Sequence, residues 1–298
     1  MKIRELQSNE WDRLAHLIFH STNAWYQKNL NRRCFAGNDP AICRIFPEVY
    51  EALDPGCCLV ADIGGTIAGA CFYHPRETHV SLGIMNADPE FAGRGVAREL
   101  LQKVIARAEG KPVRLVSSAL NLDSYSLYNR AGFRPQSIFQ DMFLPEGKPL
   151  PATSPKVRPA KMADVRAIVN LEEQVSGIRR EKDWSFFLQD RDHQWRGMVF
   201  ENLGEITGVL FSIDHPGSCM LGPGVMHDEE AAFQLIVAQL STLAPRTPVF
   251  LVPAKAQRLT HRLYQLGARN CEIHLGQVLG KAQEIQGIVM PSFMPETG

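Results

Sequence analysis

A proline-rich segment lies almost at the midpoint of the chain and divides it into two parts. Residues 145–155 hold four prolines and one glycine within eleven positions. Proline lacks a backbone N–H and blocks a helix that precedes it, so this segment continues neither a helix nor a regular sheet. The chain has 298 residues, which suits two α/β domains of about 150 residues each. We therefore predict domains at 1–148 and 156–298, with a linker at 149–155.

The two parts resemble each other in the order of their sequence features. Features that keep their order and approximate spacing favour an internal duplication over chance, and two units are too few for a solenoid. We expect two similar domains side by side. Three features recur: a Lys-aliphatic-Arg start (2–4 and 156–158, an offset of 154), a Gly-x-Ile-x-Gly turn (65–69 and 204–208), and a Leu-Tyr pair followed by glycine (127–132 and 263–267).

The composition is that of an ordinary globular protein, with 45% hydrophobic and 21% charged residues. Lys+Arg and Asp+Glu both total 32, so the net charge gives no reason to expect nucleic acid or a membrane surface as partner. No apolar run approaches the roughly 20 residues of a membrane-spanning helix, and the start of the chain lacks the apolar region of a signal peptide. We expect a cytoplasmic protein, and a homodimer stays open.

Cysteines and histidines show no metal-binding pattern. The seven cysteines include no CxxC pair, and the nine histidines form no HExxH cluster. The cysteines lie mostly in apolar runs, which favours reduced thiols in the core. We expect no metal site.

The clearest local pattern is a strand at 78–86, a glycine-containing loop, and an amphipathic helix at 96–108. Apolar residues recur along that helix at steps of one, three and four, and Gly110 follows it as a helix-ending glycine. The remaining pattern predicts a mixed antiparallel and parallel sheet with helices on both faces, an α/β (α+β) fold. In the first half its strands are expected at 2–6, 57–63, 66–73, 113–119 and 136–144, and further helices at 9–20 and 123–131.

The loop before the amphipathic helix suits a phosphate. Gly93 and Gly95 let the backbone approach a ligand, and the first helical amides point outward at the positive end of the helix dipole. Arg94 adds a guanidinium that can engage a phosphate, although an exposed loop arginine is as often merely solvated. Alone, a Gly-x-Gly at a strand–helix junction is weak evidence, because it completes neither a P-loop nor a dinucleotide-binding motif.

A second block at 121–134 follows this loop after about thirty residues. Asn121 comes directly after a strand, and Asp123 can cap a short helix. Tyr128 lies next to a core-facing leucine and can reach over the strand ends. The alternative is an amphipathic aromatic with a packed ring and a solvated hydroxyl, and both interpretations stay open on the residues alone.

Together the two blocks resemble the GNAT acetyltransferase superfamily, over about residues 1–145. In its Q/R-x-x-G-x-G/A pattern, Gly95 and Ala97 match, while Ala92 replaces the usual Gln or Arg. The N-x-x-[AS]-x-x-L-Y-x-x-x-G-F pattern matches throughout, at Asn121, Ser124, Leu127, Tyr128, Gly132 and Phe133.

The resemblance implies two GNAT-like domains, each with a splayed strand pair that receives the pantetheine arm of acetyl-CoA. It implies transfer of an acetyl group to a primary amine of a small-molecule or peptide acceptor, by direct attack on the thioester. The substrate wall is expected within 20–55. The cofactor-binding residues that it implies are Met85, Asn86, Ala87, Gly93, Arg94, Gly95, Val96, Ala97, Asn121 and Ser124.

For catalysis, Tyr128 resembles the family's usual general acid, which protonates the departing CoA thiolate. For the base we choose His79, because strand alternation places residues 77, 79 and 81 on one face beside the site. The alternative for His79 is that it only lines the sheet.

The second half resembles the same fold in degenerate form. In its counterpart of the phosphate loop, Pro223 removes an N–H, and Asp228, Glu229 and Glu230 repel a pyrophosphate. We expect this domain not to bind acetyl-CoA. The alternative for the whole chain is a non-catalytic CoA-binding sensor or interaction module, which the missing Gln or Arg at Ala92 favours and the complete block around Tyr128 disfavours.

Overall fold

Both halves fold as alternating strands and helices, so the α/β class expected from the sequence is confirmed. The structure, a computed structural model, describes residues 1–189 and 194–293. The first half contains β1 (Lys2–Glu5), α1 (Trp11–Leu30), α2 (Ile45–Leu53), β2 (Cys58–Ile63), β3 (Thr66–Pro75), β4 (Val80–Ala87), α3 (Val96–Arg107), β5 (Val113–Ser118), α4 (Leu122–Arg130) and β6 (Arg134–Phe143). The second contains β7 (Val157–Pro159), α5 (Val165–Ser176), α6 (Glu181–Gln189), β8 (Trp195–Asn202), β9 (Glu205–His215), β10 (Ser218–Met226), α7 (Glu229–Leu243), β11 (Val249–Pro253), α8 (Gln257–Gln265), β12 (Arg269–Leu279) and β13 (Ile288–Met290).

Local signals start and stop the helices that matter for the site. Helix α3 begins after Gly95, whose φ of 77° is left-handed, and it buries Leu100 and Val104 against the sheet. Helix α4 begins at Asn121, whose side-chain oxygen accepts a hydrogen bond from the Ser124 backbone N–H at 3.1 Å. Gly95 and Asn121 thus determine where α3 and α4 begin.

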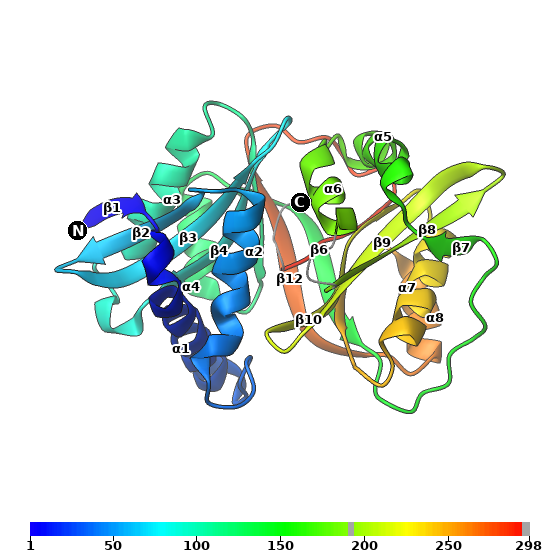
Figure 1. Ribbon diagram of the computed structural model, residues 1–298, viewed down its shortest axis with the longest axis horizontal. Coiled ribbons are helices and arrows are strands. Elements are labelled where there is room, and N and C mark those ends of the chain that lie inside the picture. Colours follow the sequence, from blue (N-terminus) through cyan, green and yellow to red (C-terminus); the bar gives the residue numbers. More distant parts are fainter. Residues whose placement is uncertain (190–193, 294–298) are drawn as a thin grey trace.

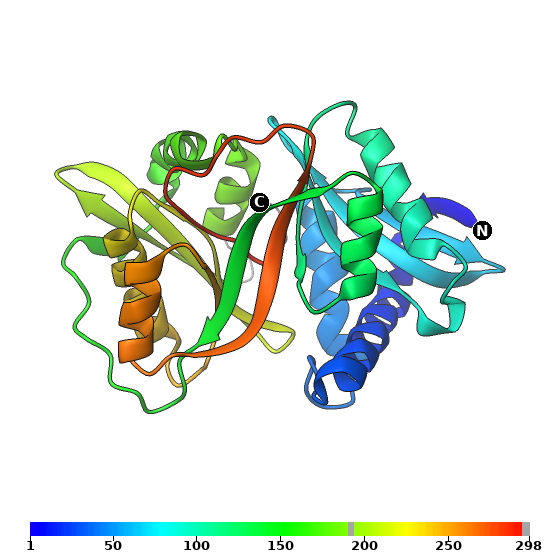
Figure 2. The same ribbon diagram turned by 180° about the vertical axis from the view of Figure 1, so that it is seen from behind.

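Helices cover both faces of the sheet in each half. Helices α1 and α2 lie on one face of the first half, and α3 and α4 lie on the other (Figures 1 and 2). In the second half, α5 and α6 lie on one face and α7 and α8 on the opposite face (Figures 1 and 2). The repeated arrangement agrees with the duplication inferred from the sequence.

The last strand of each half has crossed into the sheet of the other. The strand order is β1-β2-β3-β4-β5-β12-β6-β11-β10-β9-β8-β7, so a single sheet runs through both halves. Strand β12 pairs antiparallel with β5, from His274↔Ser118 to Leu279↔Val113. Strand β6 pairs with β12 along one edge and with β11 along the other. The two exchanged strands lie side by side at the centre of the molecule (Figure 1).

The expectation that a strand near 136–144 completes the sheet of the first half is therefore wrong. That segment forms β6 but pairs with strands from the second half. Two domains of the same fold present equivalent edges for their last strands, so an exchange keeps every ladder hydrogen bond. The periodicity of a strand carries no information on which edge it will occupy.

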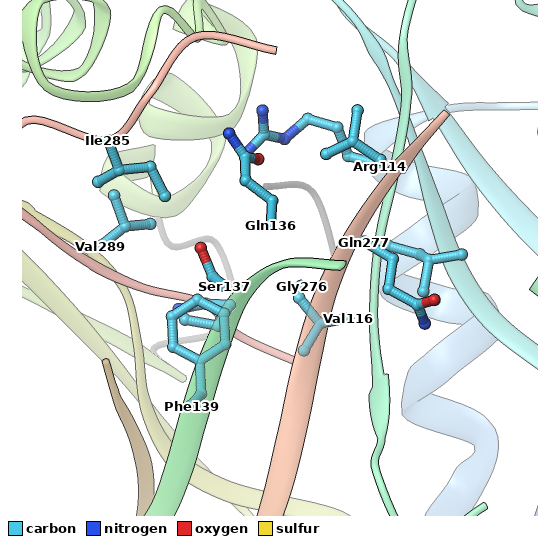
Figure 3. A pocket seen from close by; sticks show the side chains of 12 residues that line it. Arg114, Val116, Gln136, Ser137, Phe139, Gly276, Gln277, Ile285 and Val289 are labelled. Carbon is cyan, nitrogen blue, oxygen red and sulfur yellow. The ribbon is translucent and has the colours of Figure 1, made fainter. Parts of the chain in front are cut away.

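The junction of the exchanged strands is well packed. It encloses a cavity of about 20 Å³, which suits about one water molecule. Figure 3 shows Val116 of β5, Phe139 of β6 and Gln277 of β12 around this cavity, with Ile285 from the segment before β13 and Val289 from β13 itself. The space is far too small for a cofactor or an acceptor.

The halves also share a core and an ion cluster. One continuous apolar cluster contains Phe72 of the first half and Leu251 of the second. Arg76, just after β3, contacts Asp54 at 2.8 Å and Asp183 of α6 at 2.5 Å, and all three side chains are buried. The halves are thus joined by strands, apolar packing and charge.

The proline-rich connection contains neither helix nor strand over residues 144–156. The domain boundaries at 148 and 156 stay a prediction. Because β6 and β12 have crossed between the halves, a cut at these residues would not leave two complete sheets. Within the described ranges, no helix combines the length and the apolar character needed to span a lipid bilayer.

Candidate functional site

Strands β4 and β5 separate after two residue pairs. They pair in parallel at Val80↔Val113 and Ser81↔Arg114 and diverge beyond that point. The divergence opens a cavity of about 530 Å³, lined by 82–86 of β4, by 116–118 of β5 and by the start of α4. The splayed strand pair that the resemblance implied is present in the first half.

The exposed edge of β4 has unused hydrogen-bonding capacity. Met85 and Asn86 line the cavity, whereas Ala87 does not. The Asn86 amide donates from Nδ2 to Ser21 Oγ at 2.9 Å and to Thr22 Oγ1 at 3.2 Å, which positions helix α1 beside the strand. Asn86 Oδ1 is buried without a hydrogen-bond partner among the described residues. A buried acceptor that faces a cavity fits an amide-containing ligand such as pantetheine.

The glycine loop lies at the open end of the splayed pair, because it follows the C-terminal end of β4. Gly93 and Gly95 have φ of 76° and 77°, and no side chain caps the first amides of α3. The Arg94 guanidinium lies over the Phe91 ring at 5.2 Å, and Val96 is buried in the core. Val96 and Ala97 can therefore contact a pyrophosphate only through their backbone amides. The loop itself lies outside the lining of the cavity.

The second block meets the cavity on the side of β5. Asn121, Ser124 and Tyr128 all line it, so the structure brings the two sequence blocks to one place. Tyr128 is 6% exposed, and its ring packs at 5.8 Å from the ring of Phe133. Tyr128 thus lies beside any group held between β4 and β5.

The prediction for the general base is not supported by the geometry. His79 precedes β4 at the end where β4 and β5 are still paired, and it is absent from the lining of the cavity. Its ring nitrogens lie 3.1 Å from Thr78 Oγ1 and 3.2 Å from Ser81 Oγ. Strand alternation predicts on which face of the sheet a residue lies, but it does not predict whether the residue lies at the paired or at the splayed end of the strand.

The region expected to form the substrate wall divides between cavity and core. Five of the aromatic and basic residues between 20 and 55 line the cavity: Tyr26, Arg32, Arg33, Phe35 and Phe46. Tyr50 is instead fully buried, where it packs on Phe72.

The second half closes the far side of the cavity, which the sequence did not indicate. The turn between β9 and β10 reaches α2 and the segment before it, and a Cβ on Gly217 would lie 2.5 Å from the Ile42 carbonyl oxygen. Figure 1 shows this hairpin extending toward α1 and α2. From the exchanged strands, Asp141 of β6 and Glu272 and His274 of β12 also line the cavity.

These three residues form two buried polar groups. Tyr26 Oη donates to Glu272 Oε2 at 3.0 Å, and Arg32 Nη2 lies 3.3 Å from the same oxygen. His274 Nδ1 lies 2.9 Å from Asp141 Oδ1. Burial raises the pKa of the Asp141 carboxyl, and the hydrogen bond to His274 partly offsets that effect.

Sequence reasoning missed these groups because their position beside the cavity depends on the exchange of strands. The only local signal is the alternation Glu272-x-His274 in a strand that also contains Ile273 and Leu275. Such alternation indicates one polar face but does not say that the face borders a cavity in the other half.

The corresponding opening in the second half is filled by the chain itself. Strands β10 and β11 also pair in parallel for two residues, at Met220↔Val249 and Leu221↔Phe250. Beyond that point β13 pairs with β10, from Gly224↔Met290 to Met226↔Ile288. Val225 and Met226 lie as far past the divergence as Met85 and Asn86 do in the first half, where the strand borders the cavity instead.

The acidic start of helix α7 is likewise engaged within the protein. Asp228 caps the helix by accepting from the Ala231 N–H at 2.8 Å, and the Glu230 carboxylate pairs with Arg262. Both observations agree with the expectation that the second half does not bind acetyl-CoA.

The described residues contain no group of three or more His, Cys, Asp and Glu side chains placed to hold a metal ion. Thiols near the cavity are poor acids, since burial raises the pKa of Cys34 and of Cys271 to about 11. Besides thiols, the ionisable side chains that line the cavity are two phenols, one imidazole, two carboxylates and two guanidinium groups.

Comparisons with known proteins agree with this geometry. Residues 22–133 match the family model described as the Acetyltransferase (GNAT) family. N-acetylaspartate synthetase from Homo sapiens is 32% identical over 104 residues, which are 33% of this chain and 34% of that protein. The match thus spans about a third of the length of that relative.

Solved structures share the fold of the whole chain. A Pyrococcus horikoshii protein named as a candidate acetyltransferase has a TM-score of 0.74 at 14% identity, covering 99% of this chain and 93% of that one. A tandem GNAT protein from the clavulanic acid biosynthesis pathway has a TM-score of 0.62 at 14% identity, covering 93% and 98%. A GCN5-related N-acetyltransferase from Sphaerobacter thermophilus has a TM-score of 0.62 at 17% identity, covering 95% and 98%.

Proposed function

Because the chain carries a domain of the acetyltransferase (GNAT) family and has the tandem fold of such proteins, we propose that it transfers an acetyl group from acetyl-CoA to a primary amine. The observation that carries this proposal is the divergence of β4 and β5 into a cavity lined by Asn86, Asn121 and Tyr128. One acetyl-CoA per chain would bind there, because the corresponding opening of the second half is filled by β13.

Backbone and side-chain groups of the first half fit the cosubstrate. The free edge of β4 offers main-chain groups and Asn86 Oδ1 to the amides of pantetheine. Gly93 to Ala97 offer the backbone amides at the start of α3 to the pyrophosphate, and Arg94 adds a positive charge. Ala92 supplies no side chain to the phosphates, so the loop binds mainly through its backbone.

The reaction needs no enzyme nucleophile. The amine nitrogen attacks the thioester carbonyl carbon, the bond from that carbon to sulfur breaks, and an amide and the CoA thiol are formed. The Tyr128 hydroxyl donates the proton that the departing sulfur requires. The protein thus contributes orientation, a proton donor and exclusion of water.

The acceptor is a small-molecule or peptide amine that enters from the side of Tyr26 and Arg33. Amino acids are the first acceptors to test, because Arg33 can bind a carboxylate and because one similar protein is named for the synthesis of N-acetylaspartate.

Replacing Tyr128 by Phe tests the proposal. With an accepted amine, we expect thiol release to slow about 100-fold while the affinity for acetyl-CoA stays unchanged, because only the proton donor is lost. The matched control is Tyr264→Phe, since Tyr264 occupies the equivalent position of the second half and its hydroxyl contacts Gln140 and Asn270. The control should keep wild-type turnover.

If Tyr128→Phe and wild type turn over equally, the role of Tyr128 is wrong. If the intact protein binds acetyl-CoA but acetylates no amine of a broad panel, the non-catalytic CoA-binding module becomes the better account.

A further inference from the structure

We propose that His274, on the strand that the second half contributes, is the general base of the acetyl transfer, with Asp141 as its positioning residue. This inference rests on the proposed function and supplies the base that the first half lacks. It assigns a catalytic role to the exchange of β6 and β12.

A base is required because primary aliphatic amines are mostly protonated near neutral pH, with pKa values around 10. An ammonium nitrogen has no lone pair and cannot attack a carbonyl carbon. Among the described lining residues, the guanidinium groups cannot accept a proton, and Tyr128 is the proposed acid. Burial raises the pKa of the Tyr26 phenol and of the three thiols, which keeps these groups protonated; the thiols are Cys34, Cys219 and Cys271. Glu272, Asp141 and His274 remain.

Hydrogen bonding distinguishes these three. Glu272 Oε2 is occupied by Tyr26 and Arg32, and Asp141 Oδ1 is occupied by His274. A carboxylate next to Nδ1 keeps the imidazole proton on that nitrogen, which leaves the lone pair on Nε2. Nε2 makes no hydrogen bond within the described part of the chain. His274 thus lines the cavity with Nδ1 bound to Asp141, and in the neutral ring Nε2 is the nitrogen that can accept a proton.

Packing fixes the orientation of the ring. The imidazole is 6% exposed, and the Phe293 ring lies against it at 4.7 Å between centroids. Asp141 belongs to β6, and the register pairs Asp141 with Glu272, two residues before His274 on β12. The two exchanged strands thus set the imidazole and its carboxylate together.

The register with β5 places this base at the splayed end of the cofactor slot. His274 lies directly opposite Ser118, the last residue of β5, and both line the cavity. The chain continues from Ser118 into Asn121 and helix α4, which carries Tyr128. The proposed acid comes from the first half and the proposed base from the second, and both adjoin the end of β5.

Glu272 adds an attraction for the incoming cation. Its Oε1 is buried, lines the same face and has no hydrogen-bond partner within the described ranges. An unpaired buried carboxylate oxygen is costly unless a ligand donates to it, and an ammonium group is such a donor. The acceptor would arrive as a cation beside the base that deprotonates it.

In this step His274 Nε2 removes one proton from the ammonium group, and the nitrogen lone pair then forms the bond to the thioester carbon. The bond from that carbon to sulfur breaks, and Tyr128 gives its proton to the sulfur. The second proton that leaves the nitrogen restores the Tyr128 phenol. The products are the amide and the CoA thiol, and the imidazolium returns its proton to solvent.

The test is His274→Asn in the full chain, measured with acetyl-CoA and an accepted amine. We expect kcat at pH 7 to fall by about 100-fold or more, with the dissociation constant of acetyl-CoA unchanged. Activity should rise again with pH as the amine deprotonates in solution. The matched control is His261→Asn on the exposed face of α8, which should keep wild-type kcat.

The second variant is Asp141→Asn, which tests the positioning residue. Because Asp141 acts through His274, we expect a loss of kcat on the order of tenfold, a shifted acid limb of the pH–rate profile and unchanged KM for acetyl-CoA. Other titratable or charged groups around the imidazole must be considered when that limb is assigned; they are Glu272, Tyr26, Arg32, Arg33, Cys34, Cys219, Cys271 and Tyr128.

The outcomes separate this inference from the proposed function. A wild type that acetylates amines while His274→Asn retains kcat within about threefold overturns the assignment of the base alone. If His274→Asn does not fold, the pH–rate profile of Asp141→Asn provides the test. An acid limb at the same pH as in wild type would then overturn the assignment of the base. A wild type without any turnover overturns the proposed function first.

Discussion

Gly93 and Gly95 determine whether the start of helix α3 can receive a phosphate. Their φ values of 76° and 77° lie in the left-handed region, where an L-residue costs about 1 kcal/mol or more. A Cβ on Gly93 would meet no atom within 4 Å, so only backbone conformation, and not crowding, makes glycine necessary there.

Gly93→Ala should weaken acetyl-CoA binding about fivefold, because about 1 kcal/mol of strain drives the loop away from the phosphate-binding conformation. Gly110→Ala is the matched control, since Gly110 lies shortly after the end of the same helix, with φ of 85° and equally open space. Both variants should lose similar free energy of unfolding, but only the first should change the calorimetric dissociation constant. Equal effects on binding would remove the loop from the cofactor site.

At the scale of elements, a buried ion cluster connects helix α2 with helix α6. Asp54, at the end of α2, contacts His74 at 2.6 Å, Arg76 at 2.8 Å and Lys182 of α6 at 2.8 Å. Burial alone would raise the pKa of the Asp54 carboxyl, but hydrogen bonds from His74 and Arg76 lower it well below its usual range. A carboxyl with a depressed pKa stabilises the fold above its unfolded pKa of about 4 and loses that contribution as the pH falls.

Asp54→Asn should therefore lower the free energy of unfolding by about 3 kcal/mol at pH 7, because it removes one of the two carboxylates that face the buried Arg76 guanidinium. The difference from wild type should shrink as the pH decreases from 5 to 2, as urea denaturation at each pH can measure. Asp12→Asn is the control, since that side chain is 79% exposed and pairs only with Arg44 at the surface. A difference that stays constant with pH would contradict the role of Asp54.

Local patterns in the sequence predict most helices and strands of the first half, but not the exchange of its last strand. The glycines before α3 act within a few residues of their helix, whereas the cap of α4 is Asn121 and not the expected Asp123. The place of His79 depends on where β4 stops pairing with β5, a contact between strands that a local pattern does not show. Asp141 and His274 were missed because they meet only after two strands 133 residues apart have exchanged sheets.

At the scale of the whole molecule, the exchange makes the two halves one functional unit. The first half provides the open slot between β4 and β5, and the second provides β12 beside β5 and the turn that closes the cavity. A fragment that ends at residue 148 would lack the strand that pairs with β5, so the proposed binding and turnover are expected of the intact chain. The second half has its own slot filled by β13 and acts in support of the first.

Calorimetric titration of acetyl-CoA into the intact protein tests this account most directly. We expect one binding site per chain, because one slot is open to the cavity and the other is occupied by the chain's own strand. Two equivalent sites per chain would contradict the distinction between the halves, and no binding to the folded protein would contradict the acetyltransferase function itself.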